Sequence, residues 1–199
     1  FSDSAEFFGD FSTRHKKSPV GLLTDHVHYQ IALLAAYQAG GDERCLKEAV
    51  ENATWMRTHL EDAENGGFYY NLHDPNAKGF LLLRDKPWDD NMAAARSFMA
   101  LSALTGDPLW EGVTRSILKY FGEQIRFRGF FAASYGIAYD LLKNQPIHIV
   151  IVGARESAAA QKLHRAAFEL PHPYKVIQWL DPQKDKLKIG SVSYPADKT

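Results

Sequence analysis

The stretch Asn91-Met-Ala-Ala-Ala-Arg-Ser-Phe-Met-Ala-Leu101 decides the fold of this chain, because almost every side chain in it is apolar or small. Arg96 is the only charged residue in the stretch. A helix with so narrow a polar face is buried on most of its sides. We therefore expect a helix over residues 89–104 that lies in the interior and has other helices packed around it.

A Gly-Asp turn pattern typical of α-hairpins occurs twice, once before and once after this predicted helix. Gly41-Asp42 recurs as Gly106-Asp107 after 65 residues; at each site the Gly permits the left-handed conformation that ends one helix, and the Asp can cap the next. Thr24 is the N-cap that we expect for the first helix. The repeat predicts antiparallel α-hairpins, each with an inner and an outer helix. The inner helices are expected over residues 24–39, 89–104 and 131–143, and the outer helices over residues 42–62 and 107–121.

The remaining segments have a different pattern. Residues 68–88 lack helical periodicity and fit a β-hairpin or a long excursion. Near the C-terminus, the runs Ile147-His-Ile-Val-Ile-Val152 and Tyr174-Lys-Val-Ile-Gln-Trp-Leu180 flank a helical pattern at 155–169, which predicts a strand–helix–strand unit. We expect a mainly α fold in three parts: an N-terminal arm at 1–20, an α-hairpin domain at 21–145 and a C-terminal α/β segment at 146–199.

Composition and charge argue against several classes of protein. Lys and Arg (23) nearly balance Asp and Glu (24), and no basic block interleaved with aromatic residues exists to hold a nucleic-acid backbone. The apolar run 31–37 is far shorter than the roughly 20 residues that cross a bilayer. Cys45 is the single cysteine, which leaves no pair for an intramolecular disulfide or a zinc site. We expect no partner among nucleic acids or membranes.

The sequence also lacks the usual cofactor and targeting motifs. Gly153 ends an apolar strand, but no G-x-G-x-x-G follows it, and no metal-ligand spacing such as H-E-x-x-H occurs. We therefore expect neither a cofactor nor a metal. The chain begins at Phe1 without an initiator Met, a basic segment or an apolar leader. We expect a cytoplasmic protein, and a piece of a longer chain.

Polar and aromatic residues gather where two inner helices are predicted to begin. Asp25 and His28 share the first turn of one helix, and Trp88-Asp89-Asp90-Asn91 opens the next. Capping of the helix N-termini explains any single Asp there. A cap, however, needs none of the additional polar residues, and helix ends that converge would offer a carboxylate pair for general acid–base chemistry on a sugar. The candidate catalytic residues are Asp25, His28, Asp89 and Asp90, and the candidate substrate-binding residues are His26, Tyr29, Trp88, Asn91 and Tyr135.

Several ordered motifs resemble one known family. They are Gly21-Leu-Leu-Thr-Asp-His-Val-His-Tyr-Gln-Ile-Ala-Leu-Leu-Ala-Ala-Tyr37, Asn65-Gly-Gly-Phe-Tyr69, Leu82-Leu-Arg-Asp-Lys-Pro-Trp-Asp-Asp-Asn91 and Ile147-His-Ile-Val-Ile-Val-Gly153. Together they look like the C-terminal part of the thioredoxin-domain-containing family that includes the spermatogenesis-associated thioredoxin-like proteins. The resemblance covers roughly residues 20–180. It implies a thioredoxin-like domain joined to an (α/α)6 barrel, a toroid similar to N-acylglucosamine 2-epimerases and six-hairpin glycosidases.

The chain departs from this family in three respects. It contains no thioredoxin C-x-x-C, and its length accommodates only the last part of a six-hairpin barrel. Pro87-Trp88-Asp89-Asp90-Asn91 stands where the family has a Pro-Ser-Gly-Asn-like turn. The family's activity is poorly defined, so the resemblance implies carbohydrate chemistry by fold analogy alone.

Two functions follow as alternatives: an epimerase- or glycoside-hydrolase-like portion acting on a sugar, or a non-catalytic sugar- or protein-binding module of a larger protein. Carboxylates that face one another across an open cleft favour the enzyme, and carboxylates bonded only to their own helices favour the module. We also expect a homo-oligomer, or association with missing upstream domains, because the first and last inner helices have uncovered flanks. Those flanks carry Val27, Ile31, Leu34, Tyr135, Ile137 and Leu141.

Overall fold

Helix α4 (Trp88–Thr105) is the central element of the structure. The computed structural model describes residues 21–76, 78–79 and 84–195; the predicted arm at 1–20 and the apolar run at 80–83 lie outside the described residues. In α4, Asp89 is the single exposed residue. The expectation of a buried helix over 89–104 is confirmed, and the chain is mainly helical with a small α/β segment at its C-terminal end.

Two hairpins are built around this helix. α2 (Leu23–Gly40) is followed by α3 (Glu43–His59), and α4 is followed by α5 (Pro108–Gly122). At the two turns Gly41 has φ 65° and Gly106 has φ 68°, which is the left-handed region that glycine adopts without steric cost. The Asp42 and Asp107 side chains accept hydrogen bonds from the N–H groups of the next helices. The predicted repeat is confirmed at both turns.

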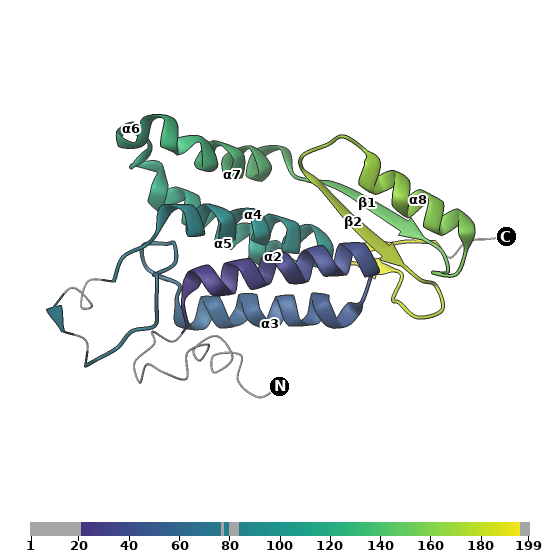
Figure 1. Ribbon diagram of the computed structural model, residues 1–199, viewed down its shortest axis with the longest axis horizontal. Helices are drawn as coiled ribbons and strands as arrows, with labels where there is room; N and C mark the ends of the chain where they lie inside the picture. The colour runs from purple at the N-terminus through teal and green to yellow at the C-terminus, as the bar shows by residue number, and fades with distance from the viewer. Residues whose placement is uncertain (1–20, 77, 80–83, 196–199) are drawn as a thin grey trace, which may run out of the picture.

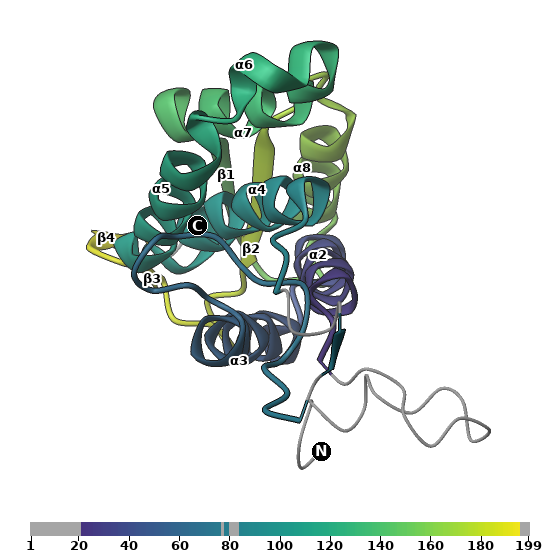
Figure 2. The same cartoon turned by 90° about the vertical axis from the view of Figure 1, so that its left-hand side faces the viewer.

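Three helices form an inner layer. α2, α4 and α7 (Ala133–Asn144) lie side by side in that order, with α3 packed on α2 and α5 on α4 (Figures 1 and 2). The short helix α6 (Ile125–Arg128) and a 3-10 turn, η2 (Gly129–Ala132), connect α5 to α7. The three inner helices begin at the same end of the molecule (Figure 1). Residues at their N-termini are therefore neighbours in space.

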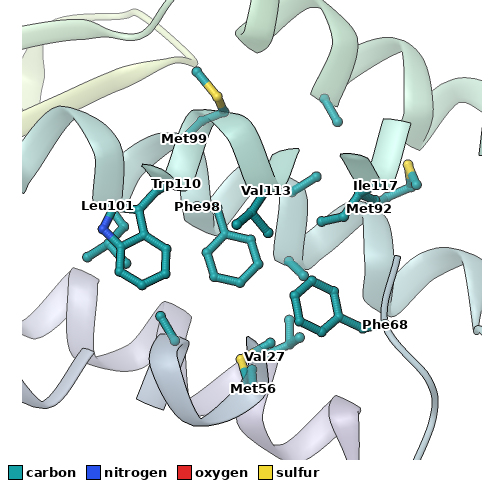
Figure 3. Close-up of a cluster of buried hydrophobic side chains, with 14 of the residues drawn as sticks. Val27, Met56, Phe68, Met92, Phe98, Met99, Leu101, Trp110, Val113 and Ile117 are labelled. Carbon is teal, nitrogen blue, oxygen red and sulfur yellow. The ribbon is translucent and has the colours of Figure 1, made fainter. Parts of the chain in front are cut away.

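Large apolar side chains fill the space between the hairpins (Figure 3). Phe98 of α4 lies at the centre and stacks on Phe68 and on Trp110, with ring centroids 5.6 and 5.8 Å away. All three rings are buried. Burial of apolar surface of this kind, worth about 25 cal/mol per Å², is the main force that holds the helices together. The other side chains labelled in Figure 3 come from all four hairpin helices: Val27, Met56, Met92, Met99, Leu101, Val113 and Ile117.

The C-terminal segment packs against the far ends of the inner helices (Figure 1). Strands β1 (Ile147–Val152) and β2 (Lys175–Leu180) are parallel and are linked by α8 (Ala158–Glu169), as the strand–helix–strand pattern predicts. A small antiparallel pair, β3 (Lys188–Ile189) with β4 (Val192–Ser193), follows. Gln178 Nε2 in β2 donates a hydrogen bond to the Tyr37 hydroxyl of α2 (2.8 Å). This bond ties the segment to the inner layer.

Two expectations are wrong in detail. α2 begins at Leu23 with Leu22 at the N-cap position, and no side chain caps it, so Thr24 is not the cap. In the described part of 68–88 the backbone forms no strand, only an isolated bridge between Glu61 and Phe68; the second apolar run of the alternative β-hairpin, at 80–83, lies outside the described residues. Of the flank residues, Val27, Leu34 and Leu141 are buried in the core. None of the described helices has the length and apolar character needed to cross a membrane.

Candidate functional site

The N-terminal ends of α2 and α4 meet through Thr24 and Asp90. The Thr24 side chain lies close enough to the Asp90 carboxyl to lower its pKa, so a residue of the neighbouring helix acts on this carboxyl. Asp25 and His28 from α2, and Asp89 from α4, are close enough to Asp90 to act on its charge. The four residues predicted to be catalytic therefore belong to one cluster, which we call the acidic cluster.

Asp90 differs from other carboxyl groups of the chain in its electrostatics. Burial raises the pKa of Asp90 above its ordinary value, and the nearby Asp89 and Asp25 carboxylates add to the rise. The nearby Thr24 and His28 side chains oppose part of this effect. A carboxyl group with a raised pKa keeps its proton to a higher pH, which is the property required of a general acid.

The other members of the acidic cluster are more accessible. His28 is exposed, and its Nδ1 lies 2.7 Å from the backbone oxygen of Thr24. Because a carbonyl only accepts, Nδ1 carries the proton in this contact and Nε2 is left as the acceptor of a neutral ring. Asp89 is exposed and Asp25 is partly buried. The cluster thus combines one shielded carboxyl group with carboxylates and an imidazole that solvent or a ligand can reach.

The aromatic residues Trp88 and Tyr135, predicted to bind substrate, pack between the start of α4, α5 and α7. Trp88 is buried, and its Nε1 donates a hydrogen bond to Ser134 Oγ (2.9 Å). The Arg128 guanidinium lies over the Trp88 ring, 4.7 Å from its centre, a favourable cation–π geometry. Tyr135, partly buried, donates its hydroxyl proton to the backbone oxygen of Leu118 (3.1 Å). The two rings lie 6.0 Å apart, and their polar atoms are engaged by the protein, so neither residue is shown to face the acidic cluster.

His26 and Tyr29, predicted to bind substrate, point away from the cluster and toward α3. His26 is fully buried, stacks on Trp55 with centroids 4.0 Å apart, and its Nδ1 lies 2.6 Å from Asn52 Oδ1. Burial lowers the pKa of His26 below its ordinary value. Tyr29 donates its hydroxyl proton to Glu48. We assign both residues to the contact between the two helices of the first hairpin, because their polar atoms bond to residues of α3.

Asn91 also has a structural role in place of the predicted substrate contact. Its side chain is fully buried. Its Oδ1 accepts a hydrogen bond from the Phe68 N–H (2.7 Å), and its Nδ2 donates to the Phe68 oxygen (3.0 Å) and to the Pro87 oxygen (2.7 Å). The side-chain amide thus makes the two hydrogen bonds to the Phe68 backbone that a neighbouring β-strand would make. Asn91 positions the chain that leads into α4, directly beside Asp90.

A buried ion pair fixes the same loop from the other side. Lys86 Nζ lies 2.8 Å from Asp62 Oδ2 and donates a hydrogen bond to the Gly66 oxygen (2.7 Å). Burial alone would raise the pKa of Asp62, but hydrogen bonds from Lys86, Asn65 and Tyr69 outweigh it and hold the pKa of Asp62 below its usual range. Lys86 and Asn91 together fix the backbone that leads into the N-terminus of α4.

Sequence reasoning missed Thr24 and Arg128, which touch the site residues Asp90 and Trp88. The one available signal was the pattern Arg126-Phe-Arg-Gly-Phe-Phe131, since alternating basic and aromatic residues are unusual on a surface. Among the described residues, no group of three or more His, Cys, Asp or Glu side chains has an arrangement that could hold a metal ion.

Comparisons with known proteins do not assign the chain to a class. No model of a known protein family matches the chain, and no curated protein matches it significantly. The fold is a layered array of α-hairpins, and the acidic cluster lies where the inner helices begin.

Proposed function

We propose that the chain is a carbohydrate-active portion of an (α/α) toroid that carries out acid–base chemistry on a sugar at the acidic cluster. The observation that carries the proposal is the environment of Asp90. Its carboxyl group is partly buried, lies near Thr24 of another helix, and has a raised pKa beside the Asp25 and Asp89 carboxylates. Two carboxyl groups with different proton affinities are the minimum set for epimerase- or glycosidase-like chemistry.

In this proposal each residue has a separate task. Asp90 is the general acid, because burial favours its protonated form. Asp25 is the base or the stabilising carboxylate on the neighbouring helix, and Asp89 and His28 hold sugar hydroxyl groups as exposed polar groups. The resemblance to the thioredoxin-domain-containing family stays a proposal, and it is consistent with an inner layer of parallel helices.

A non-catalytic module is the second candidate. The observation in its favour is that His26, Asn91 and Trp88 are buried and bonded within the protein, which leaves fewer groups for a substrate than the sequence predicted. In that case the acidic cluster would bind a sugar, or a basic protein segment, without turnover. The position of Asp90 between two helices favours the enzyme.

The test is turnover and binding with a panel of aryl glycosides and N-acyl sugars. Asp90→Asn and Asp25→Asn keep the shape of each side chain and remove its acid–base function, so both should lose turnover by at least about 100-fold. The matched control is Asp107→Asn, since Asn caps a helix as well as Asp does. Sugar binding without turnover in the unaltered chain would establish the module, and no effect of either substitution would refute the proposed site.

A further inference from the structure

The two strands of the C-terminal sheet differ in how their outer edges are covered. β1 and β2 form a two-stranded parallel sheet (Figure 1). On the outer edge of β2, the Ile177 N–H donates a hydrogen bond to Gln38 Oε1 of α2 (2.9 Å). Gln38 is held in place by its own helix, because its Nε2 donates to the Leu34 oxygen (3.2 Å). The outer edge of β2 therefore has a hydrogen-bond partner within the chain.

The outer edge of β1 lacks such a partner. The Ile147 N–H donates to the Tyr174 oxygen on the β2 side (2.8 Å), and the backbone groups of successive residues in a strand point alternately to its two sides. The N–H and C=O groups of His148, Val150 and Val152 therefore point to the outer side. Within the part of the chain that the structure describes, no group bonds to them. We call this row of backbone groups the β1 edge.

β1 also lacks the features that keep an edge strand from pairing. Such strands are usually very short, or carry Lys, Pro or a bulge. β1 is six residues long and contains neither Lys nor Pro, whereas β3 and β4 have two residues each. Burial lowers the pKa of His148 below its ordinary value, against the opposing hydrogen bond to Gln178, so β1 is uncharged at neutral pH. An uncharged edge rich in β-branched residues is a template for an additional strand.

A cavity of about 300 Å³ lies at the beginning of the β1 edge, where His148 forms part of its wall. Among the described residues that line it, Glu111 alone carries a charge at neutral pH. Glu111 Oε1 is paired with Arg115, and Oε2 accepts a hydrogen bond from Gln145 Nε2 (3.2 Å), a neutral donor. Other parts of the wall are apolar: Ala103, Pro108, Ile189 and Val192. The cavity thus offers apolar walls and one carboxylate.

The backbone of Gln145 is strained at this cavity. Its φ is 58° and its ψ is 147°, and no other residue except glycine has a positive φ among those that the structure describes. Side chains of L residues disfavour this conformation, and strain of this kind gathers at sites that bind ligands. Here the strained residue joins α7 to β1 and places its amide against Glu111. The strain is a second observation that points to a binding site beside the β1 edge.

We propose that the β1 edge binds an extended peptide segment of a partner protein, which adds a third strand to the sheet and places a Lys or Arg side chain in the cavity. An extended peptide is the ligand whose own N–H and C=O groups match the spacing of a strand edge. A Lys or Arg side chain has an apolar stem for the apolar walls and a positive head for Glu111. β1 itself contains no Lys or Arg, so a second copy paired through β1 would not supply this side chain. The inference does not depend on the proposed sugar chemistry.

Selection of a phage-displayed library of random 12-residue peptides on the full chain tests the proposal. We expect the enriched peptides to contain alternating β-branched residues and a Lys or Arg. Val150→Pro removes one outward N–H of the β1 edge and no bond to β2, a position at which an edge strand accepts Pro. It should weaken an enriched peptide by about tenfold, the value of one hydrogen bond. The matched control is Val150→Thr, which keeps the N–H and the side-chain shape and should bind the peptide unchanged. Glu111→Gln should weaken only peptides that retain the basic residue.

Methylation of the peptide backbone tests the same contact without altering the protein. N-methyl groups at alternate residues of an enriched peptide should abolish binding in one of the two alternations and leave it intact in the other, because only every second N–H of an added strand faces β1. In the unaltered chain, the amide protons of His148, Val150 and Val152 should become protected from exchange when the peptide binds. Three results would overturn the proposal: no enriched peptide, binding that neither methylation nor Val150→Pro weakens, or a chain that dimerises through β1 without peptide.

Discussion

Replacing Asn91 with Ala separates a structural role of this residue from a ligand-binding one. The amide makes three hydrogen bonds, two to Phe68 and one to Pro87, and its side chain is fully buried. Each bond contributes about 1 kcal/mol net, and a buried partner left unpaired costs about 1–3 kcal/mol. We therefore expect Asn91→Ala to lower the free energy of unfolding by about 3 kcal/mol or more. For a chain of this size that is a fall in Tm of roughly 6–12 °C.

Urea unfolding followed by tryptophan fluorescence measures this loss. The matched control is Asn144→Ala, since Asn144 is exposed at the end of α7 and its side chain donates a hydrogen bond to Asp140 one turn earlier; surface changes of this kind stay within about 0.5 kcal/mol. An Asn91→Ala chain with unchanged stability and weakened sugar binding would refute the structural role, and would restore Asn91 as a substrate-binding residue.

Three further predictions concern the buried charges. Lys86→Met leaves the Asp62 carboxylate buried without its ion-pair partner and should cost about 3–5 kcal/mol in urea unfolding; an unchanged midpoint would show that the pair is dispensable. Burial lowers the pKa of His26 and of His148, so as the pH falls the unfolded chain takes up these protons at a higher pH than the folded chain does. Tm should therefore be flat above about pH 6.5 and fall from there to pH 5. A constant Tm would contradict this prediction. Burial raises the pKa of Asp90, so its charged form opposes folding, and Asp90→Asn should raise Tm at pH 7 by an amount that shrinks below about pH 4; a lower Tm at pH 7 would contradict it.

The helices and strands are predictable because their signals are local. The Gly-Asp steps at 41–42 and 106–107 mark both hairpin turns, and the apolar composition of α4 indicates burial without reference to any partner. The strand–helix–strand order of the C-terminal segment is likewise contained in its own residues. The short pair of β3 and β4 has two residues in each strand, which is too few for a periodic pattern to be recognised.

The candidate site is predictable only in part, because side-chain partners come from other helices. The sequence brings Asp25 and Asp90 to helix starts, and the structure places them in one cluster. It does not indicate that His26 faces Asn52, or that Asn91 binds the backbone of Phe68, since these partners lie far away in the chain. Thr24 illustrates the same limit: the local pattern predicts a cap, but in the structure its side chain caps no helix and lies near Asp90 of the neighbouring helix.

The most direct test of the acid–base site is an NMR titration of the Asp90 carboxyl carbon, with and without sugars from the binding panel. The ordinary pKa of an Asp side chain is 3.8, and burial raises that of Asp90. We predict that Asp90 titrates above this value and that a bound sugar shifts its signal, while the signal of Asp107 stays unchanged. An Asp90 carboxyl that titrates at or below the ordinary value, and that no sugar perturbs, would contradict a sugar-directed general acid at the meeting point of α2 and α4.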